Sequence, residues 1–157
     1  MAKGAQRRRS TPRVDYETLA DLRYHIRRFL RVREDAARSV GIEPQQYVLL
    51  LQVKGFEHRG PATIGALTER LQIRHHATVQ LVDRLAQRGM VRRRRAETDR
   101  RGVVVELTSR GEGVLRKLAL YSLAELRMGG RALASTLVRV IELNGRRPRA
   151  KAPGRTR

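Results

Sequence analysis

Apolar side chains recur at intervals of three and four residues through most of the chain, and this period predicts amphipathic helices. The first helix is expected over residues 15–40, on an apolar stripe made of Leu19, Leu22, Ile26, Phe29 and Leu30. Further helices are expected over residues 44–55, 64–71, 75–88, 108–128 and 131–143. Glycines are expected to end three of these helices: Gly41, Gly89 and the pair Gly129–Gly130. The chain is therefore predicted to be mainly α-helical.

Beyond residue 90 the helical period gives way to alternation, which predicts two strands. The first strand is expected over residues 91–95 and the second over residues 103–107. In the second strand, the side chains of Val103, Val105 and Leu107 alternate with those of Val104 and Glu106. A polar turn over residues 96–102 joins the strands, so the segment is predicted to be a β-hairpin.

A short helix, a three-residue turn, a longer helix and a hairpin follow one another between residues 64 and 107. This order is typical of a winged helix-turn-helix, whose second helix enters the major groove of DNA while the hairpin lies over the backbone or the minor groove. In that second helix the inward stripe is expected to be Thr78, Leu81, Val82 and Leu85. The predicted fold is a mainly α winged helix-turn-helix domain with a small β-hairpin wing and flanking N- and C-terminal helices.

The charge of the chain points to a polyanionic partner. The 157 residues, enough for one domain, include 35 lysines and arginines against 15 acidic residues, which gives a formal net charge of +20. Residues 1–14 hold five basic residues and no acid, and residues 146–157 hold six and no acid. Because these ends are poor in large apolar residues, we expect two disordered basic arms, which either contact phosphates or only add solubility.

Ten arginines against four acids lie between residues 74 and 110, in a part of the chain that is predicted to be folded. The candidate DNA contacts on the second helix are Arg74, His75, His76, Gln80 and Arg84, and those on the hairpin are Arg94, Arg95, Arg100 and Arg101. Arginine at a wing tip suits a narrow minor groove or a phosphate. Gln80 has the donor and acceptor to read adenine, or it is simply solvated, and Arg74 and Arg84 suit phosphates as well as bases. Adjacent helical residues do not share a face, so His75 and His76 are not expected to bind a metal together.

Residues 67–111 resemble the winged helix of the MarR family of bacterial transcriptional regulators. The similarity rests on Asp99-Arg100-Arg101 in the hairpin, on Leu107-Thr108 at its end, and on Leu81–Leu85 followed by Arg88-Gly89. The flanking helices also look like those of the family, so the resemblance extends over about residues 15–143. One departure is the first strand, where Arg92–Arg95 is unusually basic and implies a wing that holds DNA more tightly and less selectively.

The resemblance implies a homodimer that binds palindromic operator DNA sequence-specifically, as a repressor. Within a domain of residues 15–145, dimerisation helices over residues 15–40 and 109–143 would flank a DNA-binding part over residues 44–110. The resemblance places Arg101 on the DNA and gives Asp99 the role of orienting the wing.

Many members of the family are released from DNA by a small aromatic or phenolic effector. The candidate pocket residues are Tyr24, His25, Phe29 and Tyr47, which lie near the expected junction of the dimerisation helices and the DNA-binding part. Ordinary packing in the core and the dimer interface is the simpler interpretation of these aromatic residues.

The sequence does not indicate an enzyme, because it has no cysteine and no catalytic-triad, paired-carboxylate, phosphate-loop or metal-ligand pattern. Neither a cofactor nor a metal is expected. No apolar run approaches the length of about 18 residues that a membrane span needs, so we expect a cytoplasmic, nucleoid-associated protein without a membrane partner. The alternative is an architectural protein that binds DNA largely without sequence preference and without effector control.

Overall fold

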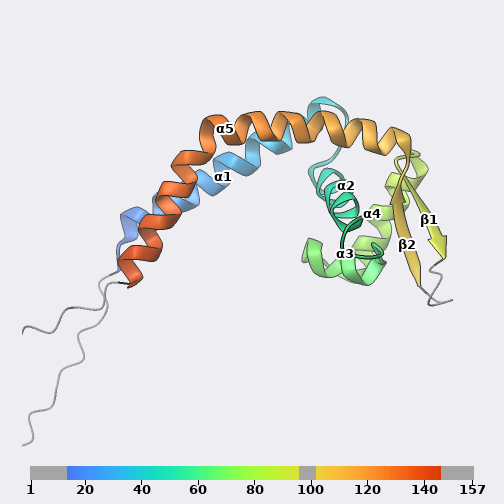
Figure 1. The fold of residues 1–157 in the computed structure, drawn as a ribbon, viewed down its shortest axis with the longest axis horizontal. Coiled ribbons are helices and arrows are strands. Elements are labelled where there is room, and N and C mark those ends of the chain that lie inside the picture. The colour runs from blue at the N-terminus through green and yellow to red at the C-terminus, as the bar shows by residue number, and fades with distance from the viewer. Residues whose placement is uncertain (1–13, 96–101, 146–157) are drawn as a thin grey trace, which may run out of the picture.

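Two long helices and a smaller group of elements at one end of them make up the fold (Figure 1). The structure is a computed structural model, and it describes residues 14–95 and 102–145. Helices α1 (Tyr16–Ser39) and α5 (Ser109–Gly145) run antiparallel and form a stalk. The group at its end comprises α2 (Pro44–Phe56), α3 (Ile64–Leu71), α4 (His75–Gln87), β1 (Val91–Arg95) and β2 (Val103–Leu107). The predicted fold class, a winged helix-turn-helix with flanking helices, is confirmed.

Local side-chain and backbone chemistry sets the helix ends. The carboxylate of Asp15 accepts hydrogen bonds from the backbone N–H (3.0 Å) and the hydroxyl (2.8 Å) of Thr18, which caps α1 and holds the pKa of Asp15 below its usual value. Pro44 begins α2, where its fixed φ suits the first helical turn. Gly41 and Gly89 follow α1 and α4 with φ of 72° and 66°, the left-handed conformation that glycine adopts without strain.

The core lies where α2 meets α4 and the hairpin. The largest fully buried side chains are Ile42, Leu49, Leu50, Leu67, Leu85, Val82, Val105 and Thr78. All four residues of the predicted inward stripe of α4 are buried. Helix α2 is apolar nearly all round, but its outer side chains Val48 and Leu51 remain 37% and 42% exposed. Helix α2 is therefore buried on its inner side only.

The turn between α3 and α4 is held by polar contacts. The hydroxyls of Thr68 and Thr78 are hydrogen-bonded at 2.9 Å, which joins the two helices at their closest approach. Gln72 turns the chain with φ of 54°, a left-handed conformation that costs a non-glycine residue about 1 kcal/mol. The geometry of the turn sets the angle at which α4 leaves the core.

The hairpin has the predicted strands. They pair antiparallel, with Val91 opposite Leu107 and Arg95 opposite Val103. The second strand also contacts the segment before α3, because the Val105 N–H donates to the Ala62 carbonyl at 2.9 Å. Residues 96–101 of the predicted turn lie outside the described residues.

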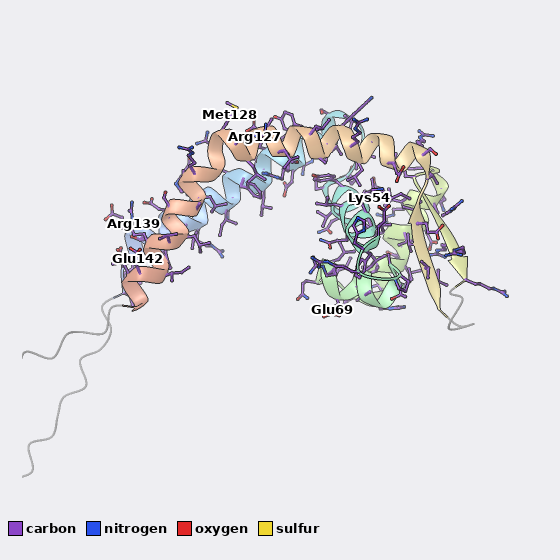
Figure 2. The ribbon with its side chains drawn as sticks, viewed as in Figure 1. Lys54, Glu69, Arg127, Met128, Arg139 and Glu142 are labelled. Carbon is purple, nitrogen blue, oxygen red and sulfur yellow. The ribbon has the colours of Figure 1, made fainter. Side chains whose placement is uncertain are left out.

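Helix α5 corrects one prediction. The pair Gly129–Gly130 was expected to separate two helices, but α5 runs without interruption from Ser109 to Gly145. Neither glycine adopts the positive φ that would end a helix, and the segment packs against α1. The helix bends at this point instead, with Met128 at the bend (Figures 1 and 2). Glycine here loosens the helix without breaking it.

The part of the chain that the structure describes contains neither a membrane-spanning helix nor a metal-binding cluster. No helix there combines the length and the apolar character that crossing a membrane requires. No group of three or more histidine, aspartate or glutamate side chains lies close enough to hold a metal ion.

Candidate nucleic-acid interface

Helix α4 presents a polar ridge on the side away from the core. His76, Gln80 and Arg84 are exposed and follow one another at intervals of four residues, so they lie on one face. Arg74 and His75, also exposed, stand at the N-terminal end of the helix. The structure thus brings together all five residues that the sequence predicts on this helix. Whether they contact DNA stays a prediction.

The N-terminus of α4 is positively polarised. Arg74 occupies the capping position without a side-chain hydrogen bond, and the first turn contains no acidic residue. Its backbone N–H groups therefore have no counter-charge of their own, and the helix dipole adds a partial positive charge. The arrangement suits a phosphate group next to the polar ridge.

The arginines of β1 divide between the two faces of the hairpin and meet acidic partners on both. On one face, the Glu106 carboxylate binds Arg92 through Nη2 at 2.8 Å and Arg94 through Nε at 2.9 Å. On the other face, the Arg93 guanidinium lies 2.6 Å from the Asp83 carboxylate of α4. Arg94 and Arg95, the two strand residues that the sequence predicts as DNA contacts, are both exposed, and Arg94 is also paired with Glu106.

The remaining predicted wing residues fall outside the part of the chain that the structure describes. These are Asp99, Arg100 and Arg101, together with the two basic arms. Their roles, including the orienting role of Asp99, stay predictions.

The base of the wing is locked to α5 by a close approach that the sequence does not reveal. The Thr108 hydroxyl donates to the Gly89 carbonyl at 2.6 Å and accepts from the Gly111 N–H at 3.1 Å. The Thr108 N–H donates to the Met90 carbonyl at 3.1 Å. A Cβ atom on Gly111 would overlap that same carbonyl, so only glycine fits there.

A second contact that sequence reasoning missed fixes the other end of α4. The Arg88 guanidinium donates to the Gly41 carbonyl at 2.7 Å and to the Gln46 side-chain oxygen at 3.0 Å. Arg88 therefore ties the end of α4 to the connection between α1 and α2. The orientation of the polar ridge relative to the stalk depends on this contact.

The structure divides the candidate effector residues. His25 and Phe29 line a hollow of about 340 Å³ between α1 and α5, at the bend of α5. Tyr24 contacts His25 edge-on, at 5.3 Å between ring centroids, but is itself exposed. Tyr47 lies elsewhere, buried in the core with its hydroxyl 3.0 Å from that of Ser122. Only His25 and Phe29 of the four residues line this hollow, and whether any of the four contacts an effector stays a prediction.

Arg33 gives the hollow a cationic wall. Its guanidinium carbon lies 3.1 Å from the centroid of the Phe29 ring, and it donates to the Phe29 and Ser122 carbonyls at 2.6 and 3.2 Å. Partial burial lowers the pKa of Arg33, but an arginine remains charged at neutral pH. The hollow thus combines an aromatic ring, an imidazole and a fixed positive charge.

The stalk exposes apolar side chains on both of its helices. On α5 the exposed stripe consists of Leu120, Leu123, Leu126, Leu137, Val138 and Ile141, and on α1 it consists of Leu19, Ile26 and Leu30. The α5 residues recur at helical spacing beside the face that packs on α1. Leu137, Val138 and Ile141 belong to the same stretch of α5 as Arg139 and Glu142, which lie at the end of the stalk farthest from Lys54 and Glu69 (Figure 2).

The winged-helix region is similar to known proteins. The model of the MarR family matches residues 40–102. YfiV of Bacillus subtilis, described as an uncharacterized HTH-type transcriptional regulator, is 33% identical over 85 residues. The match covers 54% of this chain and 49% of YfiV, so the chain spans about half the length of that relative.

Solved structures share the fold over most of the chain. A transcriptional regulator from Thermotoga maritima is 25% identical with a TM-score of 0.58, over 83% of this chain and 94% of that one. AbsC, a MarR family transcriptional regulator from Streptomyces coelicolor, is 23% identical with a TM-score of 0.62, over 86% and 92%. RV1404 from Mycobacterium tuberculosis is 22% identical with a TM-score of 0.64, over 88% and 99%. Because AbsC and RV1404 are less than 25% identical to this chain, these two matches indicate a shared fold and nothing about function.

Proposed function

We propose that this chain, whose residues 40–102 match the model of the MarR family, regulates transcription by binding double-stranded DNA as a homodimer. The observation that carries the proposal is the polar ridge of α4, which begins at a positively polarised helix end and lies beside an arginine-rich strand. A helix of this kind fits the major groove, where base edges are read, and the arginines suit phosphates.

The homodimer rests on the apolar surface of the stalk. Leucines, a valine and an isoleucine are exposed over many turns of α5, and an extended apolar stripe of this kind is typical of a protein–protein contact. A second copy of the same stalk supplies a partner with the same surface, as a two-fold dimer requires. Two copies of α4 would then read two half-sites of a palindrome, about one helical turn apart.

We propose repression, in which a dimer seated on its operator blocks the promoter. Basic arms of the kind predicted at both ends would add sequence-independent phosphate contacts. The competing proposal, an architectural protein without sequence preference, is favoured only by the net charge of +20.

We place the candidate effector site in the hollow at the bend of α5. A small aromatic or phenolic molecule would stack near Phe29 and interact with His25 and Arg33, which border the hollow. The hollow lies between the two helices of the stalk, so a ligand there would change how the stalk is held and, through it, the separation of the two α4 helices.

Replacing Gln80 by alanine is expected to change which sequences bind. If the Gln80 amide reads one base, its loss costs about 1–3 kcal/mol at one base pair and leaves other positions unaffected. Selection of binding sites from a random library with both proteins measures the change. Gln45→Ala is the matched control, because Gln45 is an exposed glutamine on α2 and lies outside the polar ridge. Equal weakening on every sequence would reduce Gln80 to a positioning residue.

A further inference from the structure

Glu106 and Asp83 form ion pairs with three of the four arginines of β1. Glu106 receives Arg92 and Arg94, one on each carboxylate oxygen, and Asp83 receives Arg93. The pairs are built into the strand register, because Arg92 lies directly opposite Glu106 on β2. The unusually basic strand is therefore partly neutralised within the protein.

Glu106 is better placed for this role than an ordinary surface acid. Its side chain is 27% exposed, whereas those of Arg92 and Arg94 are 69% and 54% exposed. It lines a hollow of about 610 Å³ together with apolar residues that include Val53, Phe56 and Leu107. The Glu106 carboxylate is thus partly shielded from water where it meets the two guanidinium groups, and reduced solvation strengthens the ion pairs.

The two acids differ in what else they do. Asp83 belongs to α4, and its bond to Arg93 also fixes the wing against that helix. Glu106 instead pairs with Arg92 and Arg94, which belong to its own hairpin. Its carboxylate therefore sets the charge of the wing without setting the position of α4.

We propose, on the basis of the proposed DNA-binding function, that Glu106 is a specificity-determining residue. Its carboxylate acts as an internal counterion for Arg92 and Arg94 and thereby limits sequence-independent binding to DNA. DNA phosphates and the Glu106 carboxylate compete for the same guanidinium donors. Phosphate contacts supply nearly all of the non-specific affinity, whereas base contacts from α4 supply the discrimination. Glu106 therefore lowers the affinity for any DNA while it leaves the reading of bases intact, which raises the ratio of specific to non-specific binding.

The test is Glu106→Gln, which removes the charge and keeps the shape. The dissociation constant for a random-sequence duplex is measured by fluorescence anisotropy across a salt series, with full-length protein. We expect roughly tenfold tighter binding at moderate salt, and a steeper dependence of log K on log salt by about 0.9 for each arginine released. The same change on a duplex that carries the selected site is expected to be smaller, because the base contacts are unchanged.

Glu34→Gln is the matched control. Glu34 pairs with Arg38 at 3.5 Å on α1, so the variant also removes one acid from an arginine pair and changes the net charge equally. Glu34 belongs to α1, which packs mainly on α5 and α2, so the substitution leaves the pairing of the hairpin unchanged. We expect its affinity to stay within about twofold of the wild type. A triple variant, Glu106→Gln with Arg92→Gln and Arg94→Gln, is expected to lose the gain in affinity and the added salt dependence.

Each outcome decides the proposal. If Glu106→Gln and Glu34→Gln tighten DNA binding equally, the effect comes from the net charge of the protein and the proposal is overturned. If Glu106→Gln instead weakens DNA binding, Glu106 has a structural role in the hairpin and the proposal is wrong. A gain that persists in the triple variant would also contradict it. If the wild type binds no DNA, the proposed function itself is wrong, whereas binding with an unchanged salt dependence in Glu106→Gln removes only this inference.

Discussion

Replacing Gly111 by alanine is expected to lower the free energy of unfolding by about 3 kcal/mol, at the upper end of the cost of overpacking. The new Cβ would overlap the Met90 carbonyl oxygen and lie 2.9 Å from its carbonyl carbon. Both atoms belong to the backbone, so no side chain can move aside. Because Met90 joins α4 to β1, the base of the wing must shift. Thermal unfolding is expected to begin about 10 °C lower for a chain of this size.

Gly113→Ala is the control for Gly111→Ala. Gly113 lies in the same helix two residues later, and no atom outside its own helical turn stands within 4 Å of the place that a Cβ would take. Alanine there is expected to raise stability by about 0.5–1 kcal/mol, because it favours the helix over the unfolded chain. If the two variants had the same stability, the close approach at Met90 would be wrong.

Replacing Leu137 by glutamate is expected to separate the dimer and to weaken operator binding by about 100-fold, the gain that linkage of two half-sites typically provides. Leu137 is 46% exposed on the apolar stripe of α5, so the single chain accommodates a charge there. In a dimer the same carboxylate would be buried against the partner stalk, where an unpaired charge is costly. Analytical ultracentrifugation measures the mass, and anisotropy measures the affinity.

Ser135→Glu serves as the matched control for Leu137→Glu. It adds the same charge to the same part of α5, but Ser135 lies off the apolar stripe. We expect it to remain dimeric. A dimeric Leu137→Glu protein, or a wild-type protein that sediments as a monomer at micromolar concentration, would contradict the proposed interface.

The helices and the hairpin could be predicted because their apolar residues follow the periods of helix and strand. The inward stripe of α4, from Thr78 to Leu85, is buried as the spacing requires. Spacing along one helix also brings His76, Gln80 and Arg84 onto one face without reference to any other element. Local pattern is sufficient for these features.

Features that depend on a distant partner could not be predicted. Gly129–Gly130 has the composition of a helix end, but packing against α1 keeps α5 helical through it. Tyr47 is a residue type that is common in ligand pockets, but the burial of α2 places it in the core. The pairing of Glu106 with two arginines depends on the strand register, which the alternation of residues alone does not fix. The need for glycine at position 111 arises from a contact with Met90 that no pattern along the chain encodes.

The central claim is that this protein reads DNA sequence as a dimer, and selection from genomic fragments tests it most directly. Full-length protein is mixed with fragments at about 200 mM salt and excess competitor DNA, and the retained fragments are sequenced. We expect a few fragments that bind about 1,000-fold or more tighter than random DNA and share an inverted repeat with half-sites about one helical turn apart. Equal retention of all fragments, with common release as salt rises, would contradict the claim and leave an architectural protein that acts through its charge.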